Sequence, residues 1–140
     1  FWVAKANGAD EIVDTVVPRA AVPELMDRVS AIAAEHQAWI AGCGHAGDGN
    51  FHALIPFNAD DPEQTRITTD IVGRLCERAQ KLQGTCTGEH GVGMGKIAYL
   101  ERELPAGTVR VMKAIKLALD PNNLLNPGKL YPTPDFTPPH

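Results

Sequence analysis

The stretch "AWIAGCGHAGDGNFHALIPF", residues 38–57, decides the fold, because two extended runs flank a tight turn within it. The first run, "AWIAGCGH", and the second, "FHALIPF", contain the aliphatic and aromatic residues that favour strands. Asp48-Gly49 between them is a favoured two-residue hairpin turn. With that turn as the loop, His45 is predicted to lie opposite His52 on one face of an antiparallel pair.

Outside this hairpin, strand and helix patterns alternate along the chain. The β-branched run 11–19 predicts a strand, and apolar residues at helical spacing predict helices over 22–37 and 62–83. A short extended piece over 85–90 and a further helix over 108–119 follow. The order β-α-β-β-α-β then predicts an α+β class of fold: a ferredoxin-like antiparallel sheet with helices on one face, plus a C-terminal helical segment.

Composition narrows the function classes. The 140 residues suffice for one domain, and a net charge of -4 argues against nucleic acid or an anionic membrane as the main partner. No apolar run approaches the ~20 residues of a membrane-spanning helix. The three cysteines, Cys43, Cys76 and Cys86, lack CxxC spacing and favour a reducing compartment. Since the chain lacks an initiator Met and a signal pattern, we expect it to be cut from something longer.

Two glycine-rich patterns do not predict nucleotide binding. "GCGHAG" matches GxGxxG, but a turn and a strand follow it instead of the helix whose N-terminus meets a pyrophosphate. "GVGMGK" resembles a phosphate loop, but His90 stands in place of the first glycine and Ile97 in place of the Ser/Thr. Both matches are interpreted as chance.

The histidine pair of the hairpin is a candidate metal site. Directly opposed residues place their Cβ atoms ~4.5–5.5 Å apart, so the two imidazoles can share a metal. From the pair alone, a solvated hairpin face without a ligand is favoured. Glu89 and His90 shift that balance, because in an extended segment Glu89 can join the histidines while His90 faces a different space. Two His and one carboxylate leave coordination positions of a metal open, as in catalytic sites, and these donors suit Zn, Mn or Fe. The alternative interpretation of Glu89-His90 is a charged loop without a ligand.

Three stretches in order, "GHAGDGNFH", "CTGEHGVGMGK" and "LDPNNLLNPGKL", resemble the C-terminal part of the FAD-linked oxidases of the vanillyl-alcohol oxidase type. Within that group they are most similar to D-lactate dehydrogenase (cytochrome) and the glycolate oxidase FAD subunit. The resemblance runs from about residue 1 to 130. It implies a ferredoxin-like substrate (cap) domain over 1–100 and a helical segment over 101–130 that packs on an FAD-binding domain outside this chain. A Pro-rich tail, 131–140, follows.

The resemblance also assigns residue roles. It makes His45, His52 and Glu89 the ligands of a divalent metal and His90 the catalytic base beside FAD. It gives Asn126 a polar contact with the flavin.

The resemblance further places Lys5 at the position of an arginine that helps bind the substrate carboxylate, where lysine keeps the charge without the bidentate fork.

The function that the resemblance implies is oxidation of a small D-2-hydroxy acid, such as D-lactate or a glycolate-like acid, by metal-assisted hydride transfer to FAD. Leu54, where the hydroxyglutarate-specific branch tends to carry Asn, favours a monocarboxylate. Cytochrome c or a quinone is the expected electron acceptor. The protein is expected in the cytoplasm, where it can associate with a membrane through that acceptor. A homodimer is compatible with the resemblance.

Two alternatives remain open: a metal-dependent hydrolase, in which Glu89 or His90 activates a metal-bound water, and a non-catalytic ferredoxin-like ligand-binding module.

Overall fold

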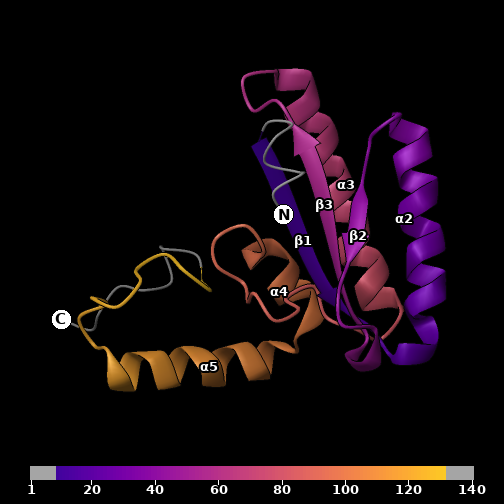
Figure 1. Ribbon diagram of the computed structural model, residues 1–140. Coiled ribbons are helices and arrows are strands. Elements are labelled where there is room, and N and C mark those ends of the chain that lie inside the picture. The colour runs from indigo at the N-terminus through magenta and orange to yellow at the C-terminus, as the bar shows by residue number, and fades with distance from the viewer. Residues whose placement is uncertain (1–8, 132–140) are drawn as a thin grey trace. The chain divides into compact units, whose positions relative to one another are not determined.

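The structure is a computed structural model that describes residues 9–131 of the chain (Figure 1). The chain divides after His90 into two compact units, residues 1–90 and 91–140. The domain limits expected from the sequence, 1–100, 101–130 and 131–140, stay a prediction.

The first unit contains an antiparallel sheet of three strands in the order β1-β3-β2. Its strands are β1 (Ala9–Val16), β2 (Ala41–Cys43) and β3 (Asn50–Phe57). The helices α2 (Val22–His36) and α3 (Pro62–Lys81) follow β1 and β3 in the chain. The predicted α+β class, with its antiparallel sheet, is therefore confirmed.

Helices α2 and α3 pack against each other, and α3 contacts both long strands (Figure 1). Successive side chains of a strand point to opposite faces, so every second residue can enter the core. Val13, Ala53 and Ile55 do so and expose at most 1% of their surface. The buried residues that α2 and α3 add to this core are Leu25, Val29, Ile32, Thr68, Ile71, Leu75, Cys76 and Ala79. Burying each large aliphatic side chain stabilises the fold by ~1.5–3 kcal/mol, so this core holds the sheet in place.

Helix α3 begins as its local sequence predicts. The Asp61 carboxylate accepts hydrogen bonds from the backbone N–H groups of Glu63 and Gln64, and Pro62 occupies the first turn. These bonds satisfy donors that a helix N-terminus otherwise leaves free. They also lower the pKa of Asp61, the bond from Gln64 most.

The predicted fourth strand is reduced to one bridge. Val16 and Thr85 exchange two backbone hydrogen bonds of 3.1 and 2.8 Å, and the described chain forms no further ladder there. The segment then leaves the sheet edge, because a turn forms at residues 88–90. The extended geometry expected for 85–90 is therefore wrong for its second half.

The hairpin turn also differs from the prediction. A two-residue turn of the expected type needs positive φ at both residues, but of Asp48 and Gly49 only Gly49 has it. Instead, a 3-10 turn, η2 (Ala46–Asp48), forms, and the carbonyl of His45 accepts from the N–H groups of Asp48 and Asn50. The predicted pairing of His45 with His52 is consequently wrong.

The residue opposite His52 on β2 is Cys43. Strand β2 is also shorter than the predicted run 38–45. A second 3-10 turn, η1 (Arg19–Ala21), joins β1 to α2.

The second unit contains α4 (Ile97–Glu103) and α5 (Ala106–Leu119). The predicted helix 108–119 is confirmed and starts two residues earlier, directly after Pro105. Val109 and Tyr131 form a small buried cluster with Leu104, Met112 and Leu117 packed around it. Within residues 9–131, no helix has the length and apolar character needed to cross a membrane.

Asp120 fixes the turn that follows α5. Its buried carboxylate accepts hydrogen bonds of 2.9 Å from the backbone N–H groups of Leu124 and Leu125 and is paired with Lys116. These contacts, the Lys116 bond first, lower the pKa of Asp120 to about 2. A folded-state pKa below the ordinary value means that ionised Asp120 stabilises the fold, and that this stabilisation is lost on acidification.

We expect Asp120→Asn to lower the melting temperature at pH 7, because the charged bonds to the turn are lost. The stabilisation is fully present above the ordinary pKa of 3.8 and is lost as pH falls through about 2. Thermal unfolding as a function of pH checks this. The difference from wild type should hold from pH 7 to about 5 and shrink towards pH 2, while Asp27→Asn, an exposed change on α2, should show none. A difference that is constant down to pH 2 would contradict the assignment.

Candidate functional site

The sheet face that lacks the aliphatic core carries two polar residues in one cross-strand row. Asp14 on β1 pairs directly with His52 on β3. The Asp14 side chain is fully buried, and that of His52 exposes 11%. Because residues paired across strands project from the same face, this row forms the floor of the candidate site.

Two loops bring further ligand-type side chains to His52. His45 precedes the η2 turn, and Glu89 lies in the 88–90 turn. The Glu89 Oε1 atom is 3.3 Å from His52 Nε2 and 3.8 Å from His45 Nε2. One ligand atom from each of the three lies within 4.8 Å of the others. The structure therefore brings together the three residues that the sequence nominates as metal ligands, although by a different strand register.

Two of the distances within this trio are compatible with a shared divalent cation. Tetrahedral coordination with bonds of ~2.0–2.1 Å separates neighbouring ligand atoms by about 3.3 Å. The distance between His52 and Glu89 already has this value, and that between His45 and Glu89 exceeds it by a few tenths of an ångström. Because the His45 and Glu89 side chains are both more than half exposed, small rotations suffice to close the remaining distance. Imidazole and carboxylate donors suit Zn, Mn or Fe.

His90 lies against the same cluster. Its ring stacks on that of His52, with centroids 4.9 Å apart and an interplanar angle of 26°. Its Nε2 is 4.0 Å from Glu89 Oε1, and about half of the side chain is exposed. The expectation that His90 faces a different space from Glu89 is thus wrong, because residues 88–90 form a turn. An imidazole beside the ligand set and open to solvent is well placed to exchange a proton with a small molecule.

Sequence reasoning missed Asp14 and Asn50. Asn50 donates to Asp14 Oδ1 through its Nδ2 at 2.7 Å, and both side chains are buried. Strand β1 contains three acidic residues, Asp10, Glu11 and Asp14, and its local sequence does not single out Asp14. Pairing β1 against β3 would have placed that residue opposite His52.

Of the three other residues named from the sequence, only Leu54 is a described residue on the same sheet face as the cluster. Lys5 lies outside the described residues. Asn126 belongs to the second unit, where it has a φ of 50° and its carbonyl accepts from the N–H of Lys129. Leu54 follows His52 by two residues on β3 and is buried, so it lies on the site face of the sheet.

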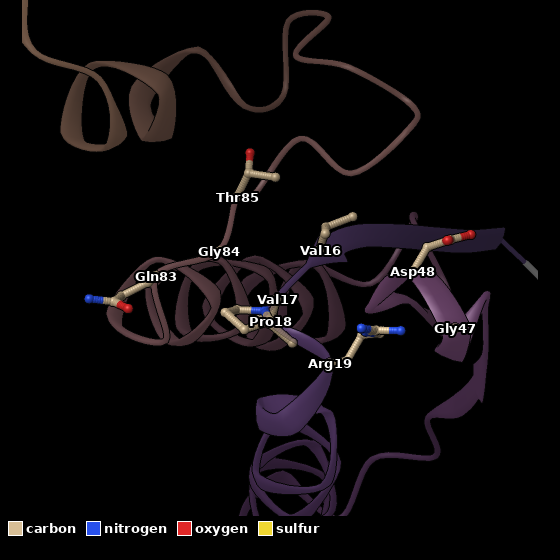
Figure 2. A pocket seen from close by; sticks show the side chains of 9 residues that line it. All are labelled: Val16, Val17, Pro18, Arg19, Gly47, Asp48, Gln83, Gly84 and Thr85. Carbon is tan, nitrogen blue, oxygen red and sulfur yellow. The ribbon is translucent and has the colours of Figure 1, made fainter.

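A cavity of about 560 Å³ borders the η2 loop without containing any of the clustered side chains. Figure 2 shows Gly47 and Asp48 on one side of it and Gln83 and Gly84 on the other. Its lining residues are Val16, Val17, Pro18, Arg19, Gly47, Asp48, Gln83, Gly84 and Thr85. It offers only Arg19 and Asp48 as charged groups, so the histidine cluster is the better candidate for chemistry.

Gly88 is the tightest point of the site. A Cβ built at this residue would lie 2.0–2.2 Å from the Asp14 carboxyl group, and the backbone φ is +52°. We expect Gly88→Ala to displace the 88–90 turn and to raise the Kd for Zn²⁺ by at least ~10-fold. Calorimetric titration with Zn²⁺ of the wild-type native protein and of its Gly88→Ala variant measures the two Kd values.

Gly91→Ala is the matched control, because Gly91 also has positive φ, +79°, but among the described residues nothing lies within 4 Å of its added Cβ. Equal Zn²⁺ affinity in the two variants would show that the contact with Asp14 does not matter.

Comparisons with known proteins agree with the three motifs. The chain matches the family described as FAD linked oxidases, C-terminal domain, over residues 1–130. An uncharacterised FAD-linked oxidoreductase of Mycobacterium tuberculosis is 45% identical over 133 residues, which are 94% of this chain and 28% of the relative. The mitochondrial D-lactate dehydrogenase [cytochrome] of Arabidopsis thaliana is 43% identical over 121 residues, 86% of this chain and 21% of the relative. A glycolate oxidase subunit of Bacillus subtilis is 39% identical over 129 residues, 92% of this chain and 27% of the relative.

The fold and the cluster define an α+β domain with a histidine-carboxylate site on the sheet face that carries Asp14 and His52. By the family match, the chain belongs to the FAD-linked oxidases and corresponds to their C-terminal domain. The resemblance drawn from the motifs is therefore confirmed. The chain spans about a quarter of the length of these relatives, 28%, 21% and 27%.

Proposed function

We propose that this chain is the substrate-binding (cap) region of a flavin-dependent dehydrogenase that oxidises a small D-2-hydroxy acid, such as D-lactate, or glycolate, to the 2-oxo acid. The observation that carries the proposal is the convergence of His45, His52 and Glu89 with His90 stacked beside them. The names of the relatives, D-lactate dehydrogenase and glycolate oxidase, share one substrate chemistry, a hydroxyl group next to a carboxylate.

His45, His52 and Glu89 are the proposed holders of a divalent cation. Two neutral imidazoles and one carboxylate form an incomplete ligand set, which leaves room for the hydroxyl and a carboxylate oxygen of the substrate. When bound, the cation supplies Lewis-acid polarisation of the hydroxyl, and FAD supplies the acceptor for the hydride.

His90 is the proposed general base for the substrate hydroxyl. Its ring is held by stacking on His52, while half of its side chain stays open to an incoming molecule. Proton removal by a positioned imidazole typically contributes ~10²–10⁴-fold to the rate.

The remaining assignments concern substrate and cofactor contacts. Leu54 presents an apolar side chain on the site face, which offers nothing to a second carboxylate and favours a monocarboxylate. Lys5 is proposed to attract the substrate carboxylate, and Asn126 to make a polar contact with the flavin.

Reoxidation of the flavin by a cytochrome is proposed from the printed name of the D-lactate dehydrogenase relatives, with a quinone as the alternative. We also propose a cytoplasmic location, membrane association through the electron acceptor, and assembly as a homodimer.

The experiment is a substrate screen of the native, flavin-loaded protein with an artificial dye as electron acceptor. D-lactate and glycolate should reduce the dye, whereas L-lactate and D-2-hydroxyglutarate should be at least ~10-fold poorer. Chelation should abolish the activity, and Zn²⁺, Mn²⁺ or Fe²⁺ should restore it.

Absence of bound flavin in the native protein, combined with metal-dependent hydrolysis of a test ester, would instead favour the hydrolase alternative. Absence of both metal and activity would favour a non-catalytic binding module.

A further inference from the structure

A buried carboxylate lies beneath the candidate site. The Asp14 side chain is fully buried and is surrounded by groups from β3 and from the 88–90 turn. A carboxylate without water is costly to bury unless hydrogen bonds and charges compensate it. The hydrogen-bond and charge partners of Asp14 therefore indicate the role of this buried carboxylate.

One carboxylate oxygen holds the turn that carries Glu89 and His90. Asp14 Oδ2 accepts from the backbone N–H of Glu89 at 2.6 Å and from that of His90 at 2.7 Å. Hydrogen bonds to an ionised carboxylate are short and roughly twice as strong as neutral ones. Gly88 also lies close to the same carboxyl group, so Asp14 contacts all three residues of the 88–90 turn. The backbone position of both functional side chains thus depends on one buried charge.

The other oxygen faces the buried imidazole of the ligand trio. Asp14 Oδ1 accepts from Asn50 Nδ2 at 2.7 Å and lies 3.4 Å from His52 Nδ1. His52 Nδ1 is buried and has no hydrogen-bond partner among the described residues. The separation is within hydrogen-bond reach, so a small reorientation of the ring would let this Nδ1–H donate to Asp14 and leave the Nε2 lone pair facing Glu89. A histidine that binds a metal through one ring nitrogen commonly donates the other N–H to a carboxylate.

We propose that Asp14 is a positioning residue of the site: it clamps the Glu89-His90 backbone and fixes the tautomer of His52 that presents Nε2 to a metal. The proposal rests on the proposed function, since it assumes that His45, His52 and Glu89 bind a divalent cation. In this assignment Asp14 acts through its neighbours and is not itself a ligand, although Asp14, His52 and His90 also offer ligand atoms within 4.8 Å of one another. Asn50 assists by holding Asp14 Oδ1 in place.

Zn²⁺ binding to the native protein, measured by calorimetry after metal removal, tests the proposal. Asp14→Asn keeps the shape but places an amide NH₂ against N–H donors, so the Kd for Zn²⁺ should rise ~10–100-fold. Asn50→Ala should raise it at least threefold. Asp27→Asn, the same chemical change at an exposed residue of α2 without a contact to the cluster, should leave the Kd unchanged.

The melting temperature of the metal-free proteins separates positioning from general stability. A merely structural Asp14 would lower the melting temperature and leave the Kd of the folded protein unchanged. An Asp14→Asn variant that is folded and binds Zn²⁺ within threefold of wild type overturns the proposal. If Asp14→Asn does not fold, Asn50→Ala decides: a Kd raised threefold or more supports the proposal, and an unchanged Kd overturns it.

The wild-type titration distinguishes this failure from failure of the proposed function. Wild type that binds no Zn²⁺, like its His45→Ala variant, overturns the proposed metal site and the role of Asp14 together. Wild type that binds Zn²⁺ while Asp14→Asn binds equally well overturns the role of Asp14 alone.

Discussion

Replacing His90 by alanine in the native, flavin-loaded protein is expected to lower the turnover of D-lactate by at least ~10²-fold. The variant loses the only imidazole of the cluster that is proposed to accept a proton instead of binding the metal. Metal content should stay at the wild-type level, because His45, His52 and Glu89 keep their distances. Steady-state kinetics with a dye acceptor, together with metal analysis of the same sample, measure both effects.

His36→Ala is the matched control for this change, because His36 ends α2 and pairs with Asp70 at 2.9 Å, with no contact to the cluster. It should keep wild-type turnover. Activity of His90→Ala within tenfold of wild type would show that the proposed base is wrongly assigned.

Replacing His52 by alanine is expected to weaken Zn²⁺ binding by at least ~10²-fold and to abolish turnover. His52 is the most buried of the three proposed ligands, with 11% of its side chain exposed against 64% for His45 and 53% for Glu89. It also joins the floor residue Asp14 to the ligand set. Its removal therefore costs a ligand and the packing that orients His90, whereas His45→Ala removes an exposed ligand only. Calorimetry with Zn²⁺ ranks the two variants.

The expected order of Zn²⁺ affinity is wild type, then His45→Ala, then His52→Ala. Equal affinity of wild type and His52→Ala at preserved melting temperature would show that this imidazole is not a ligand.

Local sequence determines the helices of this chain well. The start of α3 depends on Asp61 and Pro62: the Asp61 carboxylate accepts from the backbone N–H groups of Glu63 and Gln64, and Pro62 occupies the first turn. The apolar spacing along α2 likewise places Leu25, Val29 and Ile32 in the core. Capping and periodicity act within one or two turns, so a single sequence contains the information.

The hairpin register depends on more distant contacts. A two-residue turn and a 3-10 turn are both compatible with Asp48-Gly49, and the loop actually formed lies against the end of β1, where the Val17 N–H donates to the Gly49 carbonyl at 3.0 Å. The shift of register moves Cys43 opposite His52, yet His45 still reaches the cluster from the loop. The three predicted ligands thus converge for a reason other than the predicted one.

The supporting residue was the least predictable part of the site. The bond between Asp14 and the Glu89 N–H joins residues 75 positions apart, and no local pattern of β1 points to it. The same bond explains why 88–90 is a turn, since its N–H groups face the carboxylate instead of a neighbouring strand. Motifs indicate the ligand types, whereas only the assembled sheet identifies what holds them.

The most direct test is the rate of flavin reduction when the native protein is mixed with D-lactate without oxygen, before and after metal removal. We expect bleaching of the oxidised flavin by D-lactate, loss of this reaction on chelation, and its return when Zn²⁺ or Mn²⁺ is added back. L-lactate should leave the flavin oxidised. Reduction by D-lactate at an unchanged rate in the metal-free protein, or no reduction in the metal-loaded one, would contradict the proposed role of His45, His52 and Glu89.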